Sequence, residues 1–178
     1  MKVLVLDTSA LIMGLDPLGL ELEIYSVPEV TEELSDETGP SIRLTASISS
    51  GKLKIQNPTL PSQKEVEGKA MMLGDKFSLS KADENVLALA LDLSREGKTP
   101  IIVSDDYAVQ NVAEGLGIAY QPLATLGIRQ RFRWIYYCPA CFRQHAGENP
   151  RVCQVCGTEL KRKPLQKLMA RKRYTKKD

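Results

Sequence analysis

LVLDTSALI, residues 4–12, places a carboxylate directly after a short apolar run, and a second apolar run follows at once. The first run, which begins at Lys2, has the length and composition of a buried β-strand. An ionised carboxylate is costly to remove from water, so Asp7 at the end of such a strand needs a partner that offsets this cost. The stretch therefore predicts a buried strand whose carboxyl end carries a functional acid.

Strand and helix patterns alternate along residues 1–123. Strands are expected at residues 2–6, 23–28, 52–58, 99–106 and 118–123, and helices at 28–36, 41–51, 62–73, 80–97 and 107–117. The clearest helix has Ser80 as its N-cap and Asp83 as the capping-box partner, and it ends at Gly97. Such alternation is typical of an α/β sandwich, a parallel sheet with helices on both faces.

Acids from four distant segments are expected at one edge of this sheet. Asp7 and the pair Asp105–Asp106 follow predicted strands, and ligands of open α/β sheets bind outside the carboxyl ends of the strands. Glu33 and Asp83 lie near the starts of helices that face the same edge. Carboxylates that converge repel one another, and Mg²⁺ or Mn²⁺ relieves this repulsion. Taken singly, each acid except Asp7 also fits a structural role, as a helix-start residue, a solvated acid or part of a turn.

Four segments together resemble the PIN-domain nuclease family, namely LVLDTSALI, EVTEEL, LSKADENVLALAL and IIVSDDYAVQNVA. The resemblance covers about residues 1–123, with the motifs in the order that the family shows. It implies hydrolysis of phosphodiester bonds with the help of one or two Mg²⁺ or Mn²⁺ ions. The implied ligands and the hydroxyls that orient them are Asp7, Glu33, Asp83, Asp106, Ser9 and Ser104. Asp105 beside Asp106, and Glu32 beside Glu33, remain alternative ligands.

All four cysteines lie in two Cys-x-x-Cys motifs, Cys138–Cys141 and Cys153–Cys156, with eleven residues between the motifs. Two such motifs pair into a tetrahedral thiolate site without an open position, so we expect one structural Zn²⁺. The separation is shorter than the roughly 15–20 residues of the commonest four-cysteine pattern, and it fits a rubredoxin-like iron site less well. Disulfides would need an oxidising compartment, to which nothing in the sequence points. His145 is surplus to the four thiolates and is interpreted as a loop residue.

Charge is divided unevenly along the chain. Residues 129–178 hold fourteen Lys/Arg and three Asp/Glu residues, which gives this part a net charge of +11. Residues 1–128 hold ten Lys/Arg and nineteen Asp/Glu residues, a net charge of −9, so the whole chain carries +2. A basic end attracts polyanions such as nucleic acid, although it can also be merely a solvated tail. Nearby aromatic residues either stack on unpaired bases or pack the cysteine module against the first domain; they are Phe132, Trp134, Tyr136 and Tyr137. The predicted RNA contacts are Arg129, Arg131, Arg133, Trp134, Lys161, Arg162, Lys163, Arg171, Lys172 and Arg173.

The order of modules resembles the Nin-one-binding endonuclease family in its short archaeal form, on the segments VPEVTEELSDE, LSKADENVLALAL and YYCPACF. This resemblance implies an endoribonuclease that cleaves precursor rRNA to form the mature 3′ end of small-subunit (16S) rRNA. Its implied partners are the pre-small ribosomal subunit and other assembly factors. Two alternatives stay open: a PIN-type toxin ribonuclease, and a non-catalytic RNA-binding assembly factor.

The sequence predicts four parts: a PIN-like nuclease domain at residues 1–123, a linker at 124–134, a zinc ribbon at 135–160, and a basic C-terminal tail at 161–178, expected as a weak helix. No apolar run reaches the roughly 20 residues that span a bilayer, so we expect a cytoplasmic protein without membrane contact. The sequence lacks a P-loop and a Gly-x-Gly-x-x-Gly motif, so no nucleotide cofactor is expected. No pattern indicates the oligomeric state.

Overall fold

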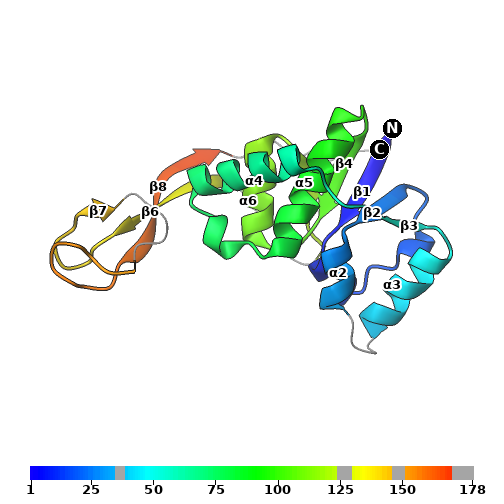
Figure 1. Cartoon of the computed structure of the whole chain (residues 1–178), viewed down its shortest axis with the longest axis horizontal. Coiled ribbons are helices and arrows are strands. Elements are labelled where there is room, and N and C mark those ends of the chain that lie inside the picture. Colours follow the sequence, from blue (N-terminus) through cyan, green and yellow to red (C-terminus); the bar gives the residue numbers. More distant parts are fainter. Residues whose placement is uncertain (35–38, 124–129, 146–150, 170–178) are drawn as a thin grey trace.

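The structure is a computed structural model that describes residues 1–34, 39–123, 130–145 and 151–169. It contains a five-stranded parallel sheet surrounded by helices and, later in the chain, a three-stranded antiparallel sheet (Figure 1). The predicted α/β sandwich with a small cysteine-bearing module after it is confirmed.

β1 (Lys2–Leu6) is the central strand of the larger sheet, in which the strands lie in the order β3-β2-β1-β4-β5. The chain runs outward from β1 on one side of the sheet and then returns to the other side, so the order reverses between β1 and β4. Ligands of such sheets bind outside the carboxyl ends of the strands at this point of reversal. The other strands are β2 (Glu23–Ser26), β3 (Leu53–Ile55), β4 (Thr99–Val103) and β5 (Ala119–Gln121).

The helices predicted between residues 28 and 117 are all present, while most of the predicted strands are shorter than expected. α1 is absent from the sequence prediction, because five residues are too few to show a helical period. In the described part of the chain, no helix combines the length and the apolar composition that a membrane crossing requires. The helical elements are α1 (Thr8–Ile12), η1 (Pro17–Gly19), α2 (Pro28–Glu33), α3 (Gly39–Ser49), α4 (Leu60–Leu73), η2 (Lys76–Ser78), α5 (Lys81–Arg95) and α6 (Tyr107–Leu116).

Apolar side chains of the sheet and the helices form one core. α5 packs against β1 and β4, and α4 and α6 in turn pack against α5. Val5, Leu87 and Ile102 are among the side chains without exposed surface, and each such burial contributes about 1.5–3 kcal/mol. This packing holds the first turn of α5, which carries Asp83, in a fixed place relative to β1 and β4.

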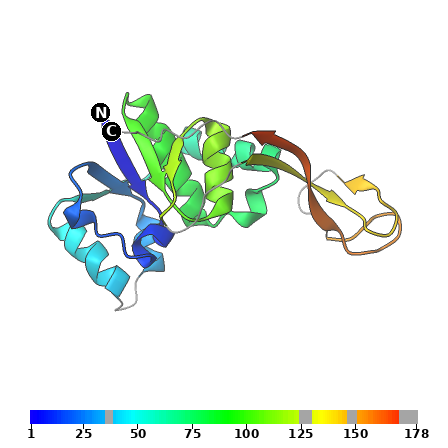
Figure 2. The same ribbon diagram turned by 180° about the vertical axis from the view of Figure 1, so that it is seen from behind.

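The second sheet has the strand order β7-β6-β8, and it extends away from the larger domain in both views (Figures 1 and 2). β6 (Gln130–Tyr137) pairs antiparallel with β7 (Gln144–His145) and with β8 (Lys161–Met169). Residues 130–134, predicted as part of a linker, therefore lie in β6. The predicted linker residues 124–129 and the last residues of the tail, 170–178, lie outside the described part of the chain.

The predicted helix after residue 161 is wrong, since residues 161–169 form β8. The Lys, Arg and Leu residues of this segment favour a helix only weakly, and hydrogen bonding to a neighbouring strand overrides that preference. Pro164 also breaks a helix interior, whereas an edge strand such as β8 tolerates proline. Pro164 lies opposite Trp134, next to an irregularity of the pairing between Arg133 and Trp134.

The close approach of α4 and α6 gives a stability prediction. A Cβ atom at Gly115 would lie 2.8 Å from Cδ1 of Leu73 and 3.0 Å from Cε of Lys69. We expect Gly115→Ala to lower the free energy of unfolding by about 1 kcal/mol, because overpacking outweighs the gain in helix propensity. Chemical denaturation monitored by circular dichroism measures this change.

Gly68→Ala is the matched control for this substitution. Gly68 also lies inside a helix, but a Cβ there would meet nothing within 4 Å. The same exchange should therefore raise the free energy of unfolding by about 0.5–1 kcal/mol. Equal effects of the two substitutions would contradict the tight packing at Gly115.

Candidate functional site

Asp7 lies at the point where β1 ends and α1 begins, and only 3% of its surface is exposed. Its Oδ1 accepts a hydrogen bond from the Thr8 amide at 2.7 Å. Its Oδ2 accepts hydrogen bonds from the hydroxyls of Ser9, at 2.8 Å, and Ser104, at 2.7 Å. Burial raises the pKa of Asp7 above its ordinary value, and these three hydrogen bonds offset only part of that effect. The carboxylate is thus held in one orientation at an electrostatic cost.

Ser104 and Asp106 follow β4, the strand that pairs with β1 at the point of reversal. The Asp106 amide donates to the Ser104 hydroxyl at 3.1 Å, so the same hydroxyl links Asp106 to Asp7. Asp106 is also the N-cap of α6, since its Oδ1 accepts from the Ala108 amide at 2.6 Å. The neighbouring Asp105 donates its own amide to the Ser9 hydroxyl at 3.1 Å. The hydroxyls of Ser9 and Ser104 therefore hold the loop that carries Asp105 and Asp106.

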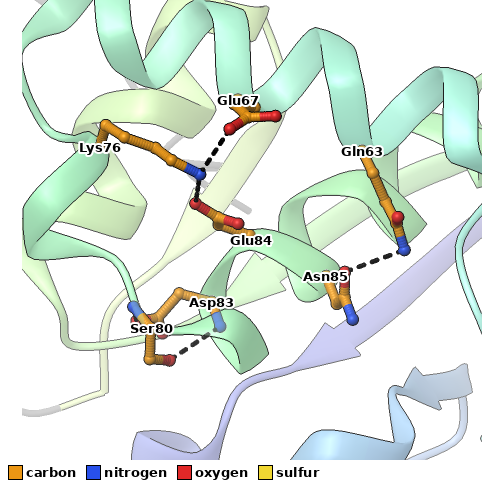
Figure 3. Close-up of polar contacts among 7 residues, drawn as sticks. All are labelled: Gln63, Glu67, Lys76, Ser80, Asp83, Glu84 and Asn85. Carbon is orange, nitrogen blue, oxygen red and sulfur yellow. Dashed lines mark hydrogen bonds and ion pairs between the residues drawn. The ribbon is translucent and has the colours of Figure 1, made fainter. Parts of the chain in front are cut away.

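Asp83 occupies the first turn of α5, where the predicted capping box with Ser80 is confirmed (Figure 3). Its Oδ2 accepts from the Ser80 amide at 2.7 Å. Burial raises the pKa of Asp83 to about 6, and the charges of Asp7 and Asp106 add to this rise. Hydrogen bonds from Ser80 act to lower the pKa but do not overcome these effects. Both neighbouring acids therefore disfavour the ionised form of Asp83.

The residue after Asp83 belongs to a different cluster. Lys76 Nζ lies 2.6 Å from Oε1 of Glu84 and 3.0 Å from Oε1 of Glu67, which ties η2 to α4 and α5 (Figure 3). The charge of Glu84 is thus paired with Lys76, whereas the charges of Asp7 and Asp106 act to raise the pKa of Asp83. Adjacent acids at the start of one helix serve separate purposes.

Glu33 is the last residue of α2, so the prediction that it lies near the start of a helix is wrong. Its Oε2 accepts a hydrogen bond from the Thr8 hydroxyl. This contact connects Glu33 to the residue that follows Asp7. One turn earlier on α2, Oε1 of Glu29 accepts from Nδ2 of Asn85 at 2.6 Å, which ties α2 to α5. The structure thus places the four predicted acids around the carboxyl ends of β1 and β4. Their assignment as metal ligands, and the choice of Asp106 over Asp105 and Glu33 over Glu32, stay predictions.

Three polar residues that the sequence pattern did not indicate support these acids or the elements that carry them. Thr8 contacts Glu33, Asn85 contacts Glu29, and Gln110 Nε2 donates to the Ser104 carbonyl at 3.0 Å. Asn85 and Gln110 are buried within apolar helix faces, where a polar side chain needs a hydrogen-bond partner. That mismatch was the signal that could have drawn attention to them. Asn85 also accepts from Nε2 of Gln63 at 3.2 Å (Figure 3).

The four cysteines form the second candidate site. Their sulfur atoms all lie within 4.8 Å of one another. Cys138 Sγ is 3.4 Å from Cys156 Sγ, and Cys141 Sγ is 3.6 Å from Cys153 Sγ. A tetrahedral zinc ion with Zn–S bonds of 2.3 Å requires sulfur atoms about 3.8 Å apart. The arrangement therefore fits one zinc ion closely.

The thiols also influence one another electrostatically. The Cys141 amide lowers the pKa of the Cys138 thiol, and hydrogen bonds with Thr158 lower that of Cys156 to about 6. Although the Arg143 amide acts to lower the pKa of Cys141, burial and the neighbouring sulfur atoms raise it to about 11. Four thiolates at this spacing cannot ionise together without a cation, and zinc binding supplies that charge.

The predicted RNA contacts divide between described and undescribed parts of the chain. Arg129, Arg171, Lys172 and Arg173 lie outside the described residues. The others lie on two adjacent antiparallel strands, in which Lys161 is opposite Tyr137 and exposed, and Lys163 is opposite Ile135. Those on β6 are Arg131, Arg133 and Trp134, and those on β8 are Lys161, Arg162 and Lys163. Basic residues distant in sequence are thus brought onto one small sheet.

Residues 4–93 match a family model described as the PIN domain of ribonuclease. The chain is 37% identical over 177 residues to Endoribonuclease Nob1 of Methanocaldococcus jannaschii, covering 99% of this chain and 85% of that protein. It is 39% identical over 159 residues to Endoribonuclease Nob1 of Pyrococcus abyssi, covering 89% and 91%. It is also 33% identical over 160 residues to Ribonuclease VapC1 of Thermoplasma acidophilum, covering 90% and 77%.

The raised pKa of Asp83 gives a prediction for stability. A carboxyl with a folded-state pKa of about 6, against an ordinary 3.8, binds its proton more tightly in the folded protein, so stability falls as the pH rises between these values. Asp83→Asn removes the charge but keeps an acceptor for the Ser80 amide. We expect it to raise the free energy of unfolding at pH 7 by about 1–2 kcal/mol and to flatten the pH dependence. Denaturant titrations from pH 4 to 8 measure both effects.

Asp92→Asn is the control, with the opposite expected sign. Burial acts to raise the pKa of Asp92, but hydrogen bonds from Ser62 and Thr59 overcome it, so this pKa lies below its ordinary value. Ionised Asp92 therefore stabilises the fold at pH 7, and Asp92→Asn should destabilise it.

Added Mn²⁺ should raise the free energy of unfolding of the unsubstituted protein more than that of the Asp83→Asn variant. Lower stability of Asp83→Asn at pH 7 would contradict repulsion at the site.

Proposed function

The chain belongs to the family of PIN-domain ribonucleases, and on that premise we propose that it is a metal-dependent endoribonuclease. The observation that carries the proposal is the gathering of Asp7, Asp83 and Asp106 at the carboxyl ends of β1 and β4, where burial and the charges of Asp7 and Asp106 raise the pKa of Asp83. An uncompensated cluster of this kind costs stability, so it is best explained by a cation that it binds.

Residues of the chain hold and orient this cluster. The hydroxyls of Ser9 and Ser104 fix Oδ2 of Asp7, and the Thr8 hydroxyl holds Glu33 at the margin of the site. When bound, one or two Mg²⁺ or Mn²⁺ ions supply an activated water and electrostatic stabilisation of the leaving 3′-oxygen. The acids also keep an RNA phosphate away until a cation is present, because both carry negative charge. Hydrolysis in this mode leaves 5′-phosphate and 3′-hydroxyl ends.

We assign RNA binding to the cysteine module and the basic segments around it. The net charge of −9 on residues 1–128 opposes RNA binding, whereas the +11 on residues 129–178 favours it. One zinc ion on Cys138, Cys141, Cys153 and Cys156 holds this small module in its fold. One end of the chain thus captures the RNA, and the other cuts it.

We extend the proposal to precursor rRNA as the substrate. Motif resemblance over nearly the whole chain supports cleavage that forms the mature 3′ end of 16S rRNA, which we place in the cytoplasm. Two aligned relatives named Endoribonuclease Nob1 support the endoribonuclease activity. The pre-small ribosomal subunit and other assembly factors are the proposed partners. The second candidate is a toxin-type ribonuclease, which the VapC relatives support. The VapC1 match covers 90% of this chain, so the length of the match does not distinguish the two candidate functions. A measurement of substrate selectivity does distinguish them.

A cleavage assay tests the proposal. With Mn²⁺ and an RNA that spans the 3′ junction of 16S rRNA, the protein should cut at one position. Asp7→Asn should lower the rate at least about 100-fold, since it removes a carboxylate ligand while keeping the shape of the side chain. Asp16→Asn, which alters the exposed cap of η1, is the control and should cut at the unsubstituted rate.

The pattern of cutting decides between the candidates. Cutting at the junction but not in unrelated RNAs supports the rRNA-processing enzyme. Indiscriminate cutting favours the toxin-type ribonuclease. No cutting with any divalent metal, together with tight RNA binding, favours the non-catalytic assembly factor.

Zinc removal tests the division of labour. Replacing Cys138 and Cys153 by Ser should release one zinc ion per chain and lower RNA affinity at least about 10-fold, because the binding surface depends on the metal for its fold. A chelator-dye assay measures the zinc, and fluorescence anisotropy measures the RNA affinity. Val155→Ala, an exposed substitution in the second cysteine motif, should change neither quantity. Unchanged RNA binding after zinc loss would place the binding surface elsewhere.

A further inference from the structure

The two cysteine motifs form equivalent turns, which we call the first and second knuckle (residues 138–143 and 153–158). In the first knuckle, the Phe142 amide donates to the Cys138 carbonyl at 2.9 Å, and the Cys138 amide donates to the Arg143 carbonyl at 2.9 Å. In the second, Gly157 donates to Cys153 at 2.9 Å, and Cys153 donates to Thr158 at 2.8 Å. Phe142 is therefore the structural equivalent of Gly157, and Arg143 that of Thr158.

The backbone at this equivalent position is left-handed in both knuckles. Gly157 has φ of +72°, which costs glycine nothing, and Phe142 has φ of +59°. Among the described residues, Phe142 is the only one other than glycine with positive φ. A residue with a Cβ pays about 1–2 kcal/mol for this conformation. The first knuckle thus carries a strain that the second avoids.

Among the residues whose burial the structure describes, little packing offsets this strain. Phe142 is 75% exposed. A phenylalanine that contributes neither to the core nor to a favourable turn is best explained by a contact with another molecule.

The surroundings indicate the chemistry of that molecule. Arg143 and Gln144 follow the ring and are exposed, and the exposed Arg151 lies just before the second knuckle. Residues 129–178 carry a net charge of +11, which favours a polyanion. An exposed aromatic ring among cations suits an unpaired nucleobase, which stacks on the ring while arginine neutralises the adjacent phosphate.

We propose that Phe142 is a base-stacking residue, whose ring binds one unpaired base of the RNA held by the cysteine module, with Arg143 on the neighbouring phosphate. The inference rests on the proposed function, because it places RNA on this module. It adds a contact at the tip of the first knuckle to the basic residues of β6 and β8.

Phe142→Gly separates binding from stability. The exchange removes the ring but installs the residue that the second knuckle uses, so zinc retention against a chelator should be equal or better. RNA affinity should fall about 5- to 150-fold, the range for loss of one stacked base. Phe142→Trp keeps a stacking surface and should bind within about 3-fold of the unsubstituted protein. Binding is measured by fluorescence anisotropy on the full chain, with a single-stranded RNA spanning the 3′ junction of 16S rRNA.

Salt dependence distinguishes the ring from the neighbouring charge. Phe142→Gly should lower the affinity without changing the slope of log K against log salt, because stacking releases no counterions. Arg143→Gln should reduce the magnitude of that slope by about 0.7, since one phosphate contact is lost. Val155→Ala, an exposed change in the second knuckle, should leave both affinity and slope unchanged.

Unchanged RNA affinity of Phe142→Gly overturns the inference, and so does an equal loss in Phe142→Trp. If the unsubstituted protein cuts the junction RNA and Asp7→Asn does not, the proposed function survives that result and only the stacking role falls. If the unsubstituted protein neither binds nor cuts the RNA, both fall.

Discussion

The proposed site depends on one unfavourable charge, the carboxylate of Asp7 at the buried junction of β1, β4 and α1. Ser9, Ser104 and the Thr8 amide hold this group in place, yet its pKa remains raised by burial. A protein selected only for stability would replace it with a neutral side chain. The supporting hydroxyls therefore preserve an orientation at the expense of stability, as expected for residues that position a ligand.

The two parts of the chain carry opposite net charges, −9 on residues 1–128 and +11 on residues 129–178. An acidic catalytic edge repels the polyanion that it is proposed to cut, so productive binding needs a cation at the edge and an attractive surface elsewhere. The antiparallel pairing of β6 with β8 supplies such a surface, because it brings basic segments around residues 131 and 162 onto one sheet. Cleavage and capture can then be tuned by separate residues.

Sequence patterns were sufficient for the parallel sheet and for the end of β1, because an apolar run followed directly by an acid marks both at once, whereas the other strands end earlier than predicted. Contacts between side chains could not be found this way: Thr8 and Glu33 are 25 residues apart, and only the pairing of β1 with β2 brings the segments that follow these strands together. β8 was misread because its composition favours a helix, whereas its conformation is set by pairing with β6. The unusual place of Phe142 was visible in the sequence, but only after CPACFR is aligned with CQVCGT.

Asp7 and Phe142 share one physical feature, a local cost that the chain itself does not offset. At Asp7 the cost is electrostatic, and a divalent cation would relieve it; at Phe142 it is conformational, and a stacked base would offset it through binding. If a zinc ion holds the four cysteines together, the module would tolerate such strain more readily than a domain that depends on a packed core, because its stability would not depend on every turn being relaxed. The proposed recognition by the tip of a knuckle would therefore cost the cysteine module little, whereas the larger domain carries the unfavourable charge of Asp7 at the edge where β1 meets β4.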